Sequence, residues 1–72
     1  MSEPIEISTD KIALGQFLKL ANVIESGGMA KWFLHEFNVF VNGEQETRRG
    51  KKLQPGDVVE VEGIGSFEVT VE

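Results

Sequence analysis

The sequence predicts an α+β fold in which two short helices pack on a small antiparallel β-sheet. Three observations support this prediction. Apolar residues recur with helical spacing in residues 12–24 and 30–37. An Asn-Gly pair at residues 42–43 follows a β-branched and aromatic run, as in a two-residue hairpin turn. Valine-rich segments at residues 58–61 and 67–71 are typical of strands.

Length and composition indicate one small globular domain covering residues 1–72. The chain is 40% hydrophobic, which separates it from disordered sequences. No apolar run approaches the ~20 residues of a membrane-spanning helix, and the acidic N-terminus does not resemble a signal peptide. With no cysteine the chain has no disulfide or thiolate metal site. We therefore expect a cytoplasmic protein without membrane contact, metal or cofactor, and its oligomeric state stays open.

The N-terminal third predicts an edge strand and then a first helix. Residues 5–7 alternate apolar with polar side chains, as an edge strand does. Residues 8–10 are of the types that form turns and helix caps. The apolar stripe that follows consists of Leu14, Phe17, Leu18 and Ala21. This stripe predicts a helix from about Ile12 to Ile24, with Lys19 off its apolar face.

The middle of the chain predicts a second helix, a strand and a tight turn. Ser26 is suited to cap the helix, and Gly27 and Gly28 leave its first turn bare. The apolar stripe of this helix consists of Ala30, Phe33, Leu34 and Phe37. A strand over residues 39–41 then leads into Asn42-Gly43. This pair favours a type I′ turn because both residues tolerate positive φ.

The rest of the chain predicts the remaining strands. Residues 44–47 are polar and fit the solvated return strand of the hairpin. Pro55-Gly56 has the order of proline and glycine found in a type II turn. Strands over residues 58–61 and 67–71 complete the sheet, and the two helices form a hairpin on one of its faces.

The basic residues are concentrated in one part of an acidic chain. The formal net charge is −5, yet all seven Lys and Arg residues lie between residues 11 and 52. Four of them, Arg48, Arg49, Lys51 and Lys52, surround Gly50. Charges in solution are screened over about 8–10 Å, so a ligand responds to the local field more than to the total charge. The middle of the chain is therefore the expected site for an anionic ligand.

Several of these features together resemble the S4 RNA-binding domain, also called the αL motif. The resemblance is carried by Leu18-Lys19-Leu20-Ala21, Ser26 with Ala30-Lys31, Val39, Val41-Asn42-Gly43, Leu53 and Pro55-Gly56-Asp57. It covers roughly residues 14–62. Residues 25–28 and 46–52 are most similar to small stand-alone bacterial S4-like proteins of the YaaA type. The resemblance implies a helical hairpin on a sheet and a structured RNA partner, with ribosomal RNA or ribosomal particles expected.

The chain departs from the S4 pattern at two positions. S4 domains usually carry an arginine directly after the serine that starts the second helix, and here that residue is Gly27. They often carry another basic residue where this chain has His35. Two phosphate contacts are thus missing or weakened. This implies either low affinity or contacts that have moved to the Arg48–Lys52 segment.

The candidate RNA-binding residues are mostly cationic: Lys19, Lys31, His35, Arg48, Arg49, Lys51 and Lys52. Ser26, Gly27, Gly28 and Gly50 are candidates for close approach of a phosphate to the backbone. Four cations in five residues favour binding over mere solubility. Lys31 fits binding and a polar helix face equally, whereas His35 fits the polar face better. The Ser-Gly-Gly segment is more simply a tight turn that needs positive φ.

Trp32 lies off the apolar stripe of the second helix, so it either packs beneath the terminal strands or stacks on an RNA base. Because tryptophan is usually well buried, we expect packing. The five phenylalanines are expected in the core, with the positions of Phe40 and Phe67 depending on strand register.

The chain shows no catalytic triad, phosphate-binding loop or carboxylate pair, so we expect a non-catalytic RNA-binding module. Two alternatives stay open. One is a protein-interaction adaptor that uses the acidic C-terminal strands as its contact surface. The other is DNA binding, because phosphate contacts alone do not distinguish the two nucleic acids.

Overall fold

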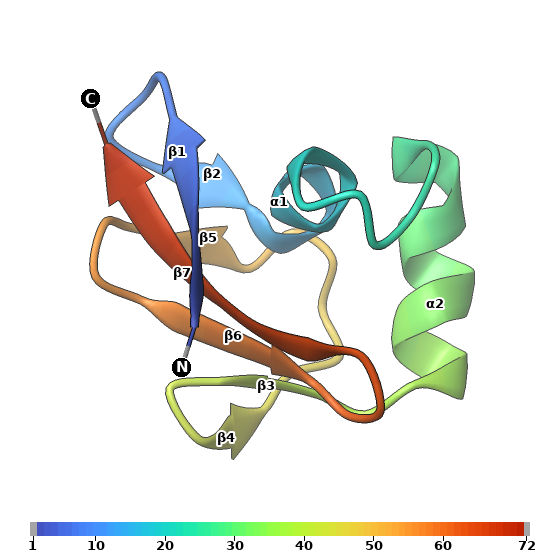
Figure 1. The fold of residues 1–72 in the computed structure, drawn as a ribbon. Helices are drawn as coiled ribbons and strands as arrows, with labels where there is room; N and C mark the ends of the chain where they lie inside the picture. Colours follow the sequence, from blue (N-terminus) through green and yellow to red (C-terminus); the bar gives the residue numbers. More distant parts are fainter. Residues whose placement is uncertain (1, 72) are drawn as a thin grey trace.

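The computed structural model describes residues 2–71 and shows two helices packed against one side of a five-stranded sheet (Figure 1). The elements in chain order are β1 (Glu3–Ile7), β2 (Ile12–Ala13), α1 (Leu14–Leu20), the 3₁₀ turn η1 (Gly27–Met29), α2 (Ala30–Glu36), β3 (Val39–Val41), β4 (Glu44–Gln45), β5 (Lys52–Leu53), β6 (Val58–Val61) and β7 (Gly65–Val71). The predicted α+β class with a two-helix hairpin on a sheet is confirmed. No helix within the described residues is long and apolar enough to cross a membrane.

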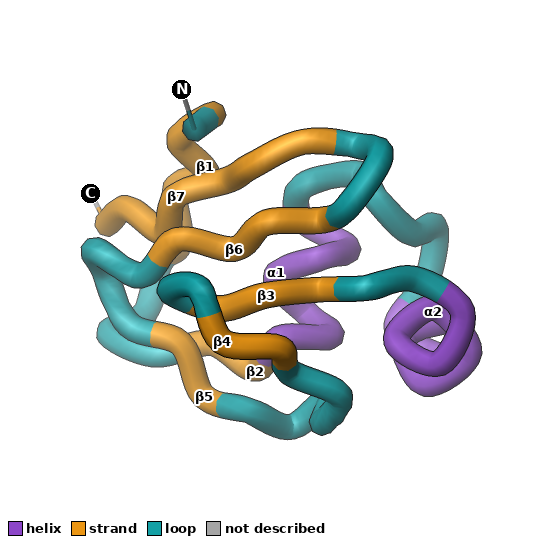
Figure 2. The backbone as a smooth tube through the Cα atoms, turned by 90° about the horizontal axis from the view of Figure 1, so that it is seen from below, coloured by secondary structure: helices purple, strands orange, loops and turns teal. Residues whose placement is uncertain are grey.

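The large sheet has the strand order β1-β7-β6-β3-β4. Its pairs β3–β4, β3–β6 and β6–β7 are antiparallel, as predicted, but β1 joins β7 in parallel, so the sheet is mixed. β1 is an edge strand, which agrees with the sequence. A second, two-stranded sheet pairs β2 with β5. Figure 2 shows β4, the loop after it and β5 on the side of the molecule opposite β1.

The first helix is shorter at both ends than predicted. Residues 12–13 form β2 because Ile12 pairs with Leu53 across the small sheet. The helix ends early because Asn22 has a φ of 61°, the left-handed conformation that commonly terminates helices. The amide of Val23 then donates to the carbonyl of Leu18 at 3.0 Å, which closes the helix end. Asparagine is one of the few residues that adopt this conformation readily.

The predicted hairpin turn is confirmed by its backbone angles. Asn42 and Gly43 have φ values of 52° and 86°, and Gly56 has a φ of 98° in the next turn. The Asn42 side chain links the two turns. Its Nδ2 donates to a carboxylate oxygen of Asp57 at 3.1 Å, and its Oδ1 accepts from the backbone amide of Val58 at 2.9 Å. The hairpin is therefore fixed in position relative to β6.

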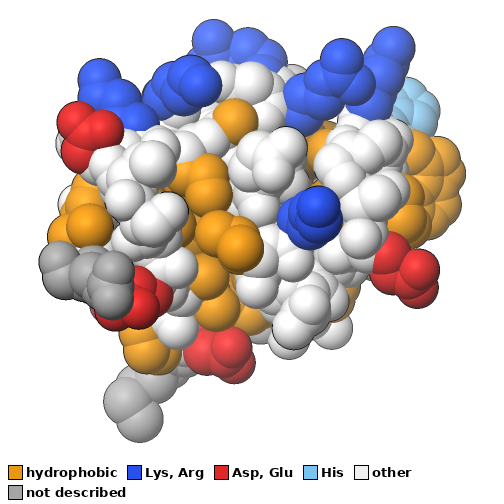
Figure 3. Space-filling view, turned by 90° about the horizontal axis from the view of Figure 1, so that it is seen from above, with side chains coloured by type: hydrophobic (Ala, Val, Ile, Leu, Met, Phe, Trp, Pro, Cys, Tyr) orange, Lys and Arg blue, Asp and Glu red, His pale blue; other side chains and the backbone are white. Residues whose placement is uncertain are grey.

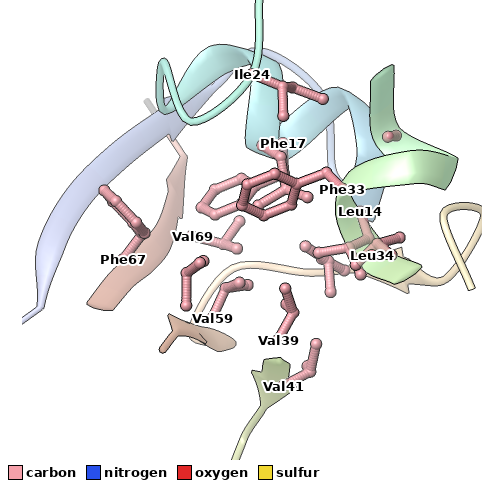
Figure 4. Packing of buried hydrophobic residues seen from close by; sticks show 14 of the residues in the cluster. Leu14, Phe17, Ile24, Phe33, Leu34, Val39, Val41, Val59, Phe67 and Val69 are labelled. Carbon is pink, nitrogen blue, oxygen red and sulfur yellow. The ribbon is translucent and has the colours of Figure 1, made fainter. Parts of the chain in front are cut away.

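The core lies between the helices and the inner face of the large sheet (Figure 4). Its members alternate along the strands and recur along the helices, and the most deeply buried are Phe17, Leu14, Leu18, Leu53, Val39, Val59, Val61 and Val69. Phe17, Phe33 and Phe67 are buried, as expected. Two phenylalanines depart from the prediction. Phe40 is half-buried, and Phe37 is 38% exposed because the chain is already extended at that residue and α2 has ended.

Candidate nucleic-acid interface

The basic loop, residues 48–52, is attached to the first turn of α1. The amide of Gly15 donates to the carbonyl of Arg49 at 2.9 Å, and the amide of Leu14 donates to the carbonyl of Lys51 at 2.8 Å. First-turn amides have no partner within their own helix, so the loop carbonyls satisfy them. The loop backbone is therefore held in place while the side chains of Arg48, Arg49 and Lys52 are exposed.

Gly15 makes this attachment possible, and the sequence analysis did not single it out. A Cβ atom at residue 15 would lie 3.0 Å from the Cβ of Ala30 and 3.5 Å from the Cβ of Arg49. Glycine at this position lets α1, the start of α2 and the basic loop approach closely without displacing a neighbouring side chain. The available signal was the pair of small residues, Gly15 and Ala30, inside two predicted helices.

Glu46 organises the start of the basic loop. One of its carboxylate oxygens accepts from Nε of Arg48 at 3.0 Å and from the backbone amides of Thr47 and Arg48 at 3.2 and 3.0 Å. The hydrogen bonds and the charge of Arg48 lower the pKa of Glu46 to about 2, so it is ionised at neutral pH. Its side chain is 12% exposed, against 73% for Arg48. Part of the charge of Arg48 is thus neutralised within the protein.

The basic side chains gather along one edge of the molecule. Figure 3 shows most of the visible Lys and Arg side chains along this edge, with the histidine at one end beside hydrophobic side chains. A groove of about 520 Å³, here called the loop groove, is lined by Lys11, Arg48, Lys51 and Lys52, with Glu44, Glu46 and Asp57 also contributing. Lys11 is a cation that sequence reasoning missed. It comes near the loop because β2, which follows it, pairs with β5.

A second groove, of about 770 Å³, lies between α2 and the β3–β4 hairpin and is here called the hairpin groove. Its lining includes Lys31, Trp32 and His35 from α2 and Asn38, Gln45 and Thr47 from the opposite side. Gln45 lines both grooves, so the two adjoin at β4. Lys31 and His35 thus share one surface with the hairpin. Lys19, in the last turn of α1, lines neither groove.

The sequence is similar to proteins of one known family. Residues 5–70 match the model of the S4 domain family. The chain belongs to the S4 domain family. It is also 67% identical over 69 residues to the probable ribosome maturation protein RlbA of Bacillus subtilis (strain 168), with 96% of this chain and 97% of the relative covered. The resemblance seen over residues 14–62, to a small stand-alone S4 protein, is confirmed.

Trp32 is the clearest correction to the sequence analysis of this S4 domain. It was expected to pack beneath the terminal strands, but its side chain is 56% exposed. The reason is helical geometry: α2 buries Ala30, Phe33 and Leu34, and residue 32 points away from that stripe. Trp32 contacts Phe37 edge-on instead, with ring centroids 6.4 Å apart and an interplanar angle of 70°.

The segment where S4 domains carry Ser-Arg also differs from its prediction. Ser26 precedes η1 but its side chain makes no capping hydrogen bond. Gly27 and Gly28 do not have positive φ, so a tight turn does not require them. A Cβ atom at Gly27 would come only within 3.4 Å of the side-chain amide of Gln16, and one at Gly50 would meet nothing within 4 Å. These glycines leave bare backbone, and Gly27 and Gly50 line one hollow with Arg49.

Proposed function

We propose that this S4 domain is a non-catalytic module that binds structured ribosomal RNA during ribosome maturation. The observation that carries the proposal is the basic edge, on which Lys11, the basic loop and Lys31 line two adjoining grooves of a chain of net charge −5. The name of the Bacillus subtilis relative, a probable ribosome maturation protein, supports the ribosomal context. Such a role would place the protein in a bacterial cytoplasm, with ribosomal particles as partners.

The basic loop is well suited to phosphate because its backbone is fixed before binding. Attachment to α1 means that little further ordering is needed when a ligand arrives. Arg49 and Lys52 are exposed and, within residues 2–71, neither forms an ion pair. Gly50 leaves its backbone accessible, as a close phosphate contact requires. We therefore assign most of the binding energy to the loop, with Lys31 and Lys19 orienting the RNA.

The acidic side chains also favour an arrangement in which the basic edge, and not the sheet, faces the RNA. Glu60 and Glu68 alternate with the buried Val59, Val61 and Phe67 along β6 and β7, so they face away from the core. This outer face of the sheet repels RNA, while the basic edge attracts it. A charge distribution of this kind steers an anionic partner to one side of the molecule.

The proposal is tested by titrating a structured fragment of ribosomal RNA at several salt concentrations. Each phosphate contact contributes about −0.7 to −0.9 to the slope of log affinity against log salt, so three to five contacts give a steep dependence. Glu60→Gln is the matched charge control and should change affinity little. Absence of binding even at low salt would instead favour an adaptor that uses the acidic sheet face to contact another protein. Equal affinity for DNA of the same secondary structure would also contradict the proposal.

A further inference from the structure

Trp32 is exposed but packs against a neighbouring aromatic ring. Its edge contact with Phe37 is continued by a parallel stack of Phe37 on Phe33, with ring centroids 4.4 Å apart and an angle of 12°. Phe33 is only 4% exposed, so this series of rings connects Trp32 to the core. An indole held in this way keeps one large apolar surface in water. Tryptophan is enriched at binding surfaces, because its ring combines a large apolar area with a polar N–H group.

Directional hydrogen-bonding groups lie across the hairpin groove from α2. The side-chain amide of Gln45 donates to the side-chain oxygen of Asn38 at 2.9 Å, and Asn38 donates to a carboxylate oxygen of Glu62 at 3.0 Å. This relay holds the Gln45 amide in place and leaves it an acceptor oxygen and a second donor hydrogen. Unpaired bases are recognised by an aromatic surface and by hydrogen bonds of this kind to their edges.

The position and charge of the groove favour a nucleotide over a peptide. Thr47, in its lining, directly precedes Arg48 of the basic loop, and Lys31 lies beside Trp32. Within residues 2–71 no carboxylate lines this groove, whereas three line the loop groove. Its volume of about 770 Å³ falls in the range of about 300–1,000 Å³ typical of small-ligand sites. A strand of RNA following the basic edge would reach it without leaving the positive surface.

We propose that the hairpin groove holds one unpaired base of the bound RNA, stacked on Trp32 and contacted at its edge by Gln45, with Lys31 at the adjoining phosphate. The inference rests on the RNA-binding function proposed above and adds a preference to it. This S4 domain would select structured RNA that presents a bulged or looped nucleotide beside a paired stem.

The experiment compares two RNAs with equal numbers of phosphates, one a perfect duplex and the other a stem with an unpaired loop. Trp32 is the sole tryptophan, so its intrinsic fluorescence reports stacking directly. We expect quenching by the looped RNA and little change with the duplex. Trp32→Ala should weaken binding of the looped RNA about ten-fold, within the roughly 5- to 150-fold typical of a lost base–aromatic stack. Duplex affinity should stay within about two-fold, since phosphate contacts are retained.

Three controls make the test decisive. Trp32→Phe should recover most of the affinity, and Gln45→Ala should alter the preference among the four bases at the unpaired position. Ile64→Ala removes a 50% exposed apolar residue that does not line the groove and should have no effect. Melting curves verify that each variant is folded.

The outcomes separate the two proposals. Tight, salt-dependent RNA binding without quenching, and unaffected by Trp32→Ala, would overturn the base site and leave RNA binding intact. The groove would then be free for a peptide. Failure of both RNAs to bind at low salt would overturn the RNA-binding function and this inference with it.

Discussion

The two helices of this S4 domain are each seven residues long, yet they serve different purposes. α1 buries Leu14, Gly15, Phe17 and Leu18, and the basic loop covers its first turn. α2 buries one stripe and leaves Lys31, Trp32 and His35 in a groove open to solvent. The two helices of one hairpin therefore differ in their surroundings: α1 is covered, and α2 is open to solvent on one side. α1 supports the basic loop that carries the cations, and α2 exposes its own side chains in a groove.

The largest expected effect is a loss of stability when the buried face of α1 is truncated. Phe17 is fully buried at the centre of the core, so Phe17→Ala should lower the free energy of unfolding by about 3–5 kcal/mol. Trp32→Ala, the matched change on α2, should cost less than about 1 kcal/mol because the ring is largely exposed. Denaturant unfolding of both variants measures the contrast. Similar losses for the two would show that α2 supports the fold as much as α1 does.

A smaller effect is expected where the two helices touch. Gly15→Ala places a methyl group 3.0 Å from the Cβ of Ala30, which should destabilise the protein by about 1–3 kcal/mol. The same change should shift Arg49 and weaken RNA binding. Adding Ala30→Gly makes room again, so a double-mutant cycle should show a favourable coupling between the two changes. Additive losses would mean that the close contact does not hold the loop.

The third prediction compares binding by the loop with binding by α2. Arg48→Ala together with Arg49→Ala should weaken RNA binding more than Lys31→Ala and flatten the salt slope by about two contacts. Melting temperatures should fall by no more than roughly 4–8 °C, because both side chains are exposed and the lost ion pair of Arg48 with Glu46 contributes at most about 1 kcal/mol. If Lys31→Ala alone abolished binding while the double variant bound normally, α2 would be the main contact surface.

The loop itself offers a sharper version of that comparison. Arg48→Ala leaves the Glu46 carboxylate unpaired beside the bound phosphates, so part of the lost affinity is repulsion. Combining it with Glu46→Gln should recover part of the lost affinity, because the repelling carboxylate is then removed. Filter binding or anisotropy with labelled RNA at one low salt concentration is sufficient. No recovery would assign the whole effect to direct contact by Arg48.

The smallest effect concerns pH. The folded-state pKa of Glu46 is about 2, below its usual value of 4.5. A depressed pKa contributes stability that is full above pH 4.5 and is lost as the pH falls towards 2. The wild type should therefore exceed Glu46→Gln in stability at pH 6 by at most about 1 kcal/mol, because the exposed Arg48 is screened by solvent. The difference should shrink as the pH falls from 4.5 and vanish below about pH 2, as measured by thermal unfolding. A constant difference would exclude the ion pair as its cause.

Features that depend on neighbouring residues were predictable from the sequence. The turn at Asn42-Gly43 follows from two residues that accept positive φ. The spacing of apolar residues identified three buried positions in each helix, whereas Ala21 and Phe37, the last residue of each predicted stripe, lie beyond the helix ends and are not fully buried. The family resemblance was likewise carried by short local motifs. The six cationic residues and the histidine proposed as RNA contacts were chosen from their residue types and positions in the sequence. Their roles in binding stay predictions.

Features that depend on distant contacts were not predictable. The parallel pairing of β1 with β7 joins residues at opposite ends of the chain, and no local pattern indicates its direction. The attachment of the basic loop to Gly15 likewise joins segments that lie far apart in the sequence. The sequence allowed Trp32 to be either buried or exposed. Burial was predicted because tryptophan is usually buried, and that prediction was wrong.

The pairing of β1 with β7 has a consequence for protein synthesis. β1 emerges from the ribosome early, but its partner, from Gly65 to Val71, follows only after every other strand. Until then β1 has an unpaired edge and the Val69 position of the core is empty. Long-range pairing of this kind is slow and exposes a nascent chain to aggregation and proteolysis. Loss of the last strand should thus leave a degradable fragment, although all the basic residues would already be present.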